Sequence, residues 1–162
     1  MAVKILILLF FHILLIRKAV LQDAPVIADF NVKMALETEN KKLNFQSVLQ
    51  ATEIVINSDN KGFYIVAIMD NKIVGSLLIT YEWSDWRNGD FWWIQSVYVM
   101  PEYRKRGIFK DLYNFVKNLA KDNSQKVCGL RLYVDKENLI AQNVYKSLGM
   151  VETNYLLMEE EF

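Results

Sequence analysis

Cysteine and histidine are nearly absent from this chain, which contains one of each, Cys128 and His12. A single cysteine cannot form a disulfide within the chain, and a zinc site built from several cysteines is excluded. Any catalytic triad, Cys–His pair or two-histidine metal site would need His12, which lies inside an apolar run. These chemistries are therefore poor interpretations of the sequence, and we expect no bound metal.

An excess of charge of either sign is also lacking. The 162 residues carry 19 basic and 19 acidic side chains, so the formal net charge at pH 7 is zero. Proteins that bind nucleic acid usually carry a basic excess, so we expect no nucleic-acid partner. Apolar side chains make up 52% and aromatic ones 13% of the chain. This composition suits one folded domain with a sizeable core.

The N-terminal segment has two interpretations. Residues 5–16 are apolar except for one histidine, with basic residues on both sides. This order is typical of a secretory signal, but the run is too short to span a bilayer as a helix, and no convincing cleavage site follows. We favour a domain over residues 13–162 whose first strand is residues 13–17, preceded by an apolar extension over residues 1–12. A short signal or membrane anchor is the alternative.

The rest of the chain alternates between helical and strand patterns. Helical spacing of apolar residues indicates four helices, which begin near Asp23, Phe45, Gly107 and Asn138. Strands are expected over residues 63–69, 73–81, 91–99, 130–134 and 155–158, with a loop over 82–90. On the last helix, the residues expected to face inward are Ala141, Val144, Tyr145 and Leu148. The order β-α-α-β-β-β-α-β-α-β predicts a single α+β domain with a mixed sheet.

The most informative pattern lies at residues 97–110, where a predicted strand turns into a predicted helix. Four cations crowd the first helical turn: Arg104, Lys105, Arg106 and Lys110. The helix dipole disfavours each cation there by about 0.3–1 kcal/mol, so an anion bound among them would explain the arrangement. Gly107 would let the backbone approach such a ligand closely. On charge alone, a solvated basic turn without a ligand is an equal alternative.

This segment resembles the acetyl-CoA-binding motif of the GNAT superfamily of N-acetyltransferases, Arg/Gln-x-x-Gly-x-Gly/Ala at a strand–turn–helix junction. Arg104 and Gly107 match that pattern. Phe109 stands where the family usually has glycine or alanine, which puts the shape of the loop in doubt. A second family motif fits the spacing of Asn138, Ala141, Tyr145 and Gly149. The resemblance extends over residues 13–158.

The resemblance implies a GNAT-like mixed, mostly antiparallel sheet flanked by helices. It also implies an enzyme in which an amine attacks the thioester of acetyl-CoA directly, the acceptor being a small molecule or a protein amino group. Tyr145 would donate a hydrogen bond to the departing thiolate, a role that suits a phenol with an ordinary pKa near 10. The residues that would hold CoA are Val97, Tyr98, Val99, Arg104, Lys105, Arg106, Gly107, Ile108, Phe109 and Asn138.

The group that takes the proton of the attacking amine is left open. The predicted strand over residues 91–99 holds no carboxylate, and its uncharged polar side chains are Gln95 and Ser96, either of which could hold a water. Glu82 and Asp85 are the nearest acidic candidates. Each of them is also an ordinary type of loop carboxylate.

The acceptor site is expected near the aromatic segment 81–93, which contains all four tryptophans. Aromatic faces and carboxylates are the groups that hold a cationic amine. We therefore expect Trp83, Trp86 and Asp85 to contact the acceptor. Packing in the core or in a homodimer interface is the alternative for the tryptophans.

Two further alternatives remain at this point. The departure at Phe109 keeps open a non-catalytic CoA-binding or sensor domain of the same fold. The N-terminal apolar run keeps open a membrane-associated protein, although a cytoplasmic enzyme is the favoured interpretation. Cys128 is not expected to act as a nucleophile, because direct transfer needs no acyl-enzyme.

Overall fold

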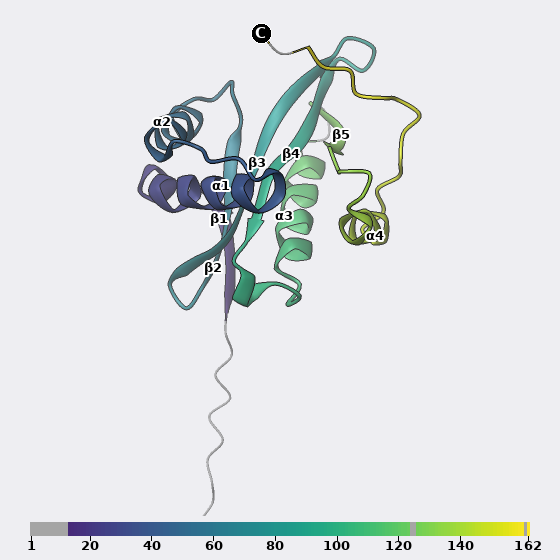
Figure 1. Ribbon diagram of the computed structural model, residues 1–162. Coiled ribbons are helices and arrows are strands. Elements are labelled where there is room, and N and C mark those ends of the chain that lie inside the picture. The colour runs from purple at the N-terminus through teal and green to yellow at the C-terminus, as the bar shows by residue number, and fades with distance from the viewer. Residues whose placement is uncertain (1–12, 124–125, 161) are drawn as a thin grey trace, which may run out of the picture. The chain divides into compact units, whose positions relative to one another are not determined.

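The computed structural model describes residues 13–123, 126–160 and 162 (Figure 1). Its elements are β1 (Leu14–Lys18), α1 (Ala24–Glu39), α2 (Phe45–Ile56), β2 (Phe63–Met69), β3 (Lys72–Ser84), β4 (Gly89–Val99), α3 (Ile108–Asp122), β5 (Val127–Leu132) and α4 (Leu139–Ser147). Short 3-10 helices precede α1 and α3, at Leu21–Asp23 and Pro101–Tyr103. The described residues up to Leu132 form one compact unit, and those from Tyr133 onward form a second.

The first unit is built on a five-stranded sheet with the order β1-β2-β3-β4-β5. Neighbouring strands from β1 to β4 are antiparallel, whereas β4 and β5 are parallel. The expectation of a mixed, mostly antiparallel sheet flanked by helices is therefore confirmed. β1 covers Leu14–Lys18, so the expected first strand is also present. Residues 1–12, with the apolar extension and His12, lie outside the described residues.

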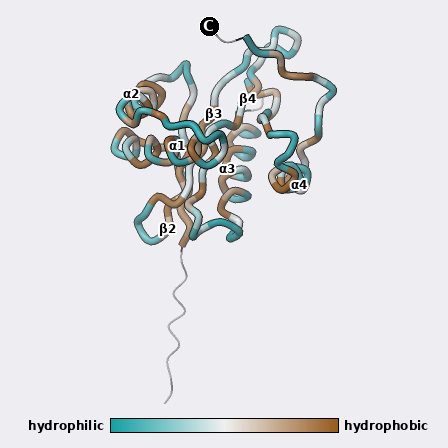
Figure 2. Tube along the Cα trace, viewed as in Figure 1, coloured by the Kyte–Doolittle hydropathy of each residue, from teal (hydrophilic) through white to brown (hydrophobic). Residues whose placement is uncertain are grey.

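Helices cover the two faces of this sheet. On one face, Ile27 of α1 packs against Tyr64 and Val66 of β2, with residues of α2 at the margin of the cluster. On the other face, a Cβ placed on Gly75 of β3 would lie 3.5 Å from the side chain of Ile108, so β3 approaches α3 closely. Figure 2 shows hydrophobic and hydrophilic residues alternating along α3, as expected for a helix with one buried side.

The hairpin between β3 and β4 is longer than expected. β3 continues to Ser84 and β4 begins at Gly89, so the expected loop over 82–90 is wrong, and only residues 85–88 lie between the strands. Antiparallel pairing persists to the pair Ser84 and Gly89. Aromatic residues favour this extended conformation, and every second added pair contributes ladder hydrogen bonds. Glu82 and Trp83 therefore belong to a strand and not to a loop.

The second unit corrects two further expectations. No strand occurs from Val151 to Glu160, where Tyr155, Leu156, Leu157 and Met158 are exposed, so the closing strand over 155–158 is wrong. A strand needs a neighbour to pair its backbone groups, and no strand is described from Tyr133 onward. In α4 and at its C-cap, Ala141, Tyr145 and Leu148 are partly buried, as expected for the inward face, whereas Val144 is exposed and so departs from that expectation.

β5 covers Val127–Leu132 and so begins and ends earlier than the expected strand over 130–134. Gly149 has a φ of 92° directly after α4, and this left-handed conformation ends the helix as expected. Among the described residues, no helix combines the length and the apolar composition that crossing a membrane requires.

A bidentate ion pair fixes the start of α1 against β1. The Arg17 guanidinium donates to the carboxylate of Asp23 at 2.6 and 3.0 Å, and the backbone N–H of Val20 donates to the same carboxylate at 2.8 Å. Burial by itself raises the pKa of Asp23, but the hydrogen bonds from Arg17 and Val20 outweigh it, and the pKa lies below its usual value.

We therefore expect Asp23→Asn to lower the free energy of unfolding at pH 7 by about 1–2 kcal/mol, measured by urea denaturation. Because the pKa of Asp23 is lower in the folded protein, its contribution is present above the ordinary value near 4 and is lost as the pH falls further. The difference between variant and wild type should shrink accordingly in acid. The control is Asp29→Asn, which removes an exposed pair with Lys33 and should change stability by less than about 0.5 kcal/mol. Equal stability of Asp23→Asn and wild type at pH 7 would contradict this account.

Candidate functional site

A β-bulge interrupts β4 at Ser96 and Val97. Tyr98 pairs with Ser76 and Gln95 pairs with Leu78, so two residues of β4 oppose one residue of β3. Ser96 has a φ of 48°, a left-handed conformation that residues other than glycine seldom adopt. One extra residue reverses the faces to which the following side chains point.

The bulge brings Gln95 and Tyr98 to the same face of the sheet. Gln95 pairs with Leu78, which packs against the cluster around Ile27 of α1. The ring of Tyr98 lies 4.9 Å from that of Phe30, also in α1. In a regular strand, residues three positions apart would face opposite sides. β4 therefore presents side chains from both sides of the bulge to the face that α1 covers.

β4 also has an open edge beyond the bulge. β5 pairs with β4 only up to Ile94 and Leu132. From Gln95 to Val99, that edge of β4 has no partner strand in the part of the chain that the structure describes. An extended ligand with amide groups could pair with such an edge as an added strand does.

The chain after β4 forms the turn that leads into α3. Gly107 is the N-cap of α3 with a φ of 85°, which favours glycine because a side chain is strained there. A Cβ placed on Gly107 would meet no atom within 4 Å, so the space over this turn is open. The exposed cations around it are Lys105, Arg106 and Lys110. A helix start with open backbone N–H groups and nearby cations is suited to a phosphate.

Arg104 has a different position from the other cations of this turn. Its Nε donates to the carbonyl of Val99 at 2.8 Å, and its Nη2 donates to Glu37 of α1 at 2.7 Å. The hydroxyl of Tyr98 donates to the second oxygen of Glu37 at 3.2 Å. Burial raises the pKa of Tyr98 above its usual value, with the negative charge of Glu37 acting in the same direction. The Arg104 side chain thus ties the turn to β4 and α1.

No sequence pattern predicted a role for Glu37, which lies 67 positions from its partner Arg104. Phe109, the departure from the family pattern, packs along its own helix, with its ring 6.3 Å from that of Tyr113. Ile108 is buried.

A polar group lies on the α1 face before the bulge. Gln95 Nε2 donates to Thr80 Oγ1 at 2.5 Å. Trp93 Nε1 donates to one carboxylate oxygen of Glu82, and Arg131 Nη1 donates to the other at 2.5 Å. The structure thus groups Glu82 with Gln95 on one face, and it adds Arg131, Thr80 and Trp93, which the sequence analysis did not single out.

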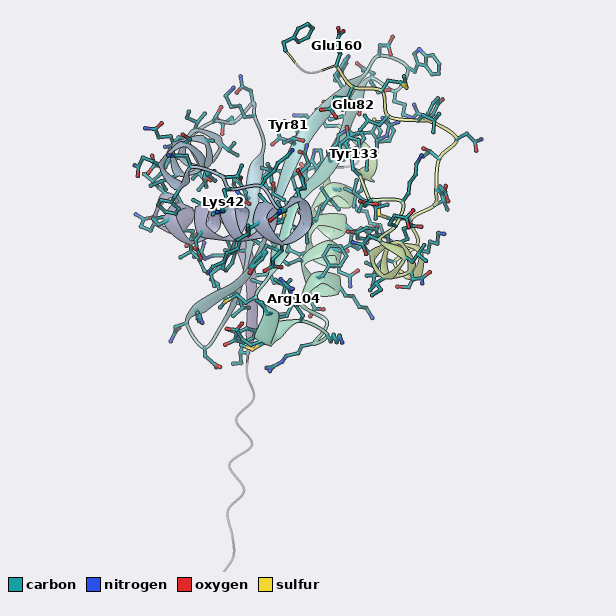
Figure 3. All side chains as sticks on the ribbon, viewed as in Figure 1. Lys42, Tyr81, Glu82, Arg104, Tyr133 and Glu160 are labelled. Atoms are coloured by element: carbon teal, nitrogen blue, oxygen red, sulfur yellow. The ribbon has the colours of Figure 1, made fainter. Side chains whose placement is uncertain are left out.

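The other predicted acceptor residues lie apart from this group. Trp83 follows Glu82 on β3 and so points to the opposite face of the sheet. Trp86 is 86% exposed in the turn, where Asp85 accepts the backbone N–H of Trp86 at 2.9 Å. Contact of Trp83, Trp86 and Asp85 with an acceptor stays a prediction, and of the predicted acidic residues Glu82 alone lies on the same face of the sheet as Gln95. Figure 3 shows Glu82 and Arg104 toward opposite ends of the sheet.

Two predicted site residues belong to the second unit. The side-chain oxygen of Asn138 accepts the backbone N–H of Ala141 at 3.0 Å and so caps α4. Tyr145 lies on α4, and burial raises the pKa of its phenol above the usual value. A phenol with a raised pKa remains a hydrogen-bond donor at neutral pH. Among the described residues, no group of three or more histidine, cysteine or acidic side chains could hold a metal ion.

Comparisons with known proteins identify relatives of this chain. The model of the acetyltransferase (GNAT) family matches residues 30–150. A crystal structure described as a possible acetyltransferase from Clostridium difficile 630 is 44% identical, with a TM-score of 0.85 over 92% of this chain and 97% of that chain. An aminoglycoside N-acetyltransferase in complex with CoA has a TM-score of 0.73 at 17% identity, covering 93% of this chain and 95% of that one, which shows a shared fold.

A curated protein also matches part of the chain. Thialysine N-epsilon-acetyltransferase of Bos taurus is 36% identical over 78 residues, which are 48% of this chain and 44% of that protein. The match therefore spans less than half the length of that relative.

Removal of Glu37 tests how the turn is held. The ion pair of Glu37 with Arg104 is half exposed, with side-chain exposures of 41% and 43%, so Glu37→Gln should cost less than about 1 kcal/mol in urea denaturation. Hydrogen exchange at residues 104–110 should nevertheless increase, because the turn loses its anchor to α1. Glu39→Gln, which removes the surface pair of α1 with Lys41, should leave exchange in the turn unchanged. Unchanged exchange in Glu37→Gln would show that the turn is held by its backbone alone.

Proposed function

The chain belongs to the acetyltransferase (GNAT) family, and on this premise we propose that it transfers the acetyl group of acetyl-CoA to a primary amine of a small molecule or a protein. The observation that carries the proposal is that an unpaired strand edge is followed directly by a helix start with open backbone N–H groups. The open edge of β4 begins at the bulge, and the same segment leads directly into the glycine-capped start of α3. An elongated ligand with amide groups and a phosphate end fits such a surface.

The residues present fit CoA in chemistry as well as in arrangement. The backbone of Val97 to Val99 offers amide partners to the pantetheine arm, and the first turn of α3 offers N–H groups to the pyrophosphate. Open space over Gly107 leaves room for the phosphates, and Lys105, Arg106 and Lys110 supply complementary charge. In this proposal the Arg104 side chain joins the turn to α1. Arg104 would therefore contact CoA through its backbone and not through its side chain. When bound, acetyl-CoA supplies an activated thioester.

The chain's own side chains have two chemical tasks. The amine is mostly protonated at pH 7, because an alkylammonium has a pKa near 10.4, so it must lose one proton before its nitrogen can attack the acetyl carbon. The nitrogen loses a second proton as the neutral amide forms. The C–S bond breaks in the same reaction, and the sulfur that leaves with the electron pair takes up a proton. We assign the donation to this sulfur to Tyr145, whose raised pKa keeps the phenol protonated.

For removal of the amine proton, a water held by Gln95 or Ser96 is the favoured route. The two oxygens of Glu82 already accept hydrogen bonds from Trp93 and Arg131. Gln95 uses its Nε2 to bond Thr80, which leaves its carbonyl oxygen to accept a hydrogen bond from a water. That water takes the proton of the ammonium and passes it to solvent. The bulge places this side chain beside the start of the open edge.

Binding of CoA is tested by Gly107→Glu. A carboxylate at the start of α3 would oppose a pyrophosphate, so calorimetry should show loss of CoA binding while circular dichroism shows an unchanged fold. The control is Gly107→Ala, which meets no neighbouring atom and should cost about 1 kcal/mol in stability through backbone strain alone. Unchanged CoA affinity in Gly107→Glu would overturn the assignment of this turn.

Catalysis is tested by Tyr145→Phe, assayed by thiol release over a panel of primary amines. Loss of the hydroxyl should lower kcat by about 10²-fold or more, while the Kd of acetyl-CoA changes little, because the hydroxyl acts in the transition state. Since the pKa of Tyr145 is raised, wild-type kcat should not decline through loss of the phenol proton below about pH 10. Cys128→Ala should retain activity. CoA binding without thiol release for any amine would favour the non-catalytic alternative.

A further inference from the structure

Glu82 and Arg131 form an ion pair that aromatic residues of β4 hold in position. Arg131 Nη1 lies 2.5 Å from Glu82 Oε1, and the side chains are 33% and 41% exposed respectively. The guanidinium carbon of Arg131 lies 3.7 Å from the centroid of the Phe91 ring, and Trp93 Nε1 donates to the other oxygen of Glu82. Both charges are therefore oriented by the sheet while they remain accessible to solvent.

This pair retains hydrogen-bonding capacity for a ligand. A guanidinium has five N–H donors, and a carboxylate has about four lone-pair sites. In the part of the chain that the structure describes, Glu82 is the one hydrogen-bond acceptor of the Arg131 side chain. Two donors reach Glu82. An adjacent cation and anion with such spare capacity complement a ligand that also carries adjacent charges of both signs.

The position of the pair sets the length of such a ligand. Arg131 pairs in register with Trp93, two residues before Gln95, and its guanidinium reaches back to Phe91, four residues before Gln95. At about 3.3 Å per residue, the pair lies roughly 7–13 Å along the strand from the start of the open edge. An extended chain of six bonds covers about 7 Å, which is the distance between the two ends of a lysine-like amino acid.

We propose that Glu82 and Arg131 bind the α-ammonium and α-carboxylate of a free amino acid, whose side-chain amine accepts the acetyl group at the bulge. This inference rests on the proposed function and narrows its acceptor to zwitterionic, lysine-like compounds. The ammonium pairs with Glu82 and the carboxylate with the remaining N–H groups of Arg131. A polyamine or an aminoglycoside brings cations only and is disfavoured by repulsion from Arg131. A lysine within a protein lacks both α charges.

Three acceptors test the two halves of this site without any mutation. Cadaverine is lysine without the carboxylate, 6-aminohexanoate is lysine without the α-amine, and all three keep the terminal amine. Because each analogue loses one charge-assisted hydrogen bond, kcat/KM for lysine should exceed that for each analogue by about tenfold or more. Calorimetry with the CoA-bound protein should show the same order of affinities.

Substitution then assigns each charge to its partner. Arg131→Met should reduce the preference for lysine over cadaverine to about threefold or less, and Glu82→Gln should do the same for lysine over 6-aminohexanoate. The control is Arg87→Met, which removes the same charge from another arginine over the Phe91 ring, at 5.2 Å, and should leave both preferences unchanged. Melting temperatures of all variants show whether they are folded.

The outcomes separate this inference from the proposed function. If simple amines and cadaverine are acetylated as well as lysine, or if Arg131→Met keeps the preference for lysine, the amino-acid site is wrong and the acetyltransferase stands. If CoA binds but no amine is acetylated, the proposed function fails and this inference fails with it.

Discussion

The bulge at Ser96 and Val97 is the constraint on which the rest of the candidate site depends. One extra residue in β4 reverses the alternation of side chains, so Gln95 and Tyr98 both face α1. β5 separates from β4 at the same level, after Ile94 and Leu132. The backbone groups along this unpaired edge need other hydrogen-bond partners, which water or an extended ligand can supply. The bulge thus lies where backbone of β4 becomes unpaired and brings side chains from both sides of it to the face that α1 covers.

The two ends of the site are held by different means. Beyond the bulge, Arg104 joins the turn before α3 to Val99 and to Glu37, which secures the turn while Lys105, Arg106 and Lys110 stay exposed. Before the bulge, Phe91 and Trp93 hold the pair of Glu82 and Arg131. The first end is cationic and suits phosphates, whereas the second is electrically balanced. This difference in charge alone favours a phosphate-bearing ligand at the first end and a ligand without net charge at the second.

Much of the fold could be predicted from local signals, and the site only in part. Asp23 marked the start of α1, and Gly107 marked the start of α3, because helix starts and positive φ depend on a few adjacent residues. Other features depend on which strands pair with one another, and a local sequence pattern does not contain that information. These features are the bulge, the long hairpin and the absence of a strand at 155–158. The same limit applies to Glu37 with Arg104 and to Glu82 with Arg131, whose partners are 67 and 49 positions apart.

The separation of the two ends along one strand has a consequence for specificity. Contacts with a donor would use mainly backbone groups from Val97 to Phe109, so they constrain conformation more than side-chain identity. Contacts with an acceptor would use side chains of Glu82, Gln95 and Arg131, which can change without altering the bulge or the turn. Because sites that share no partner change nearly independently, acceptor choice can vary in this fold while donor binding is retained. In the proposed acetyltransferase, Glu82 and Arg131 would therefore be the positions that set the chemistry of the acceptor most directly.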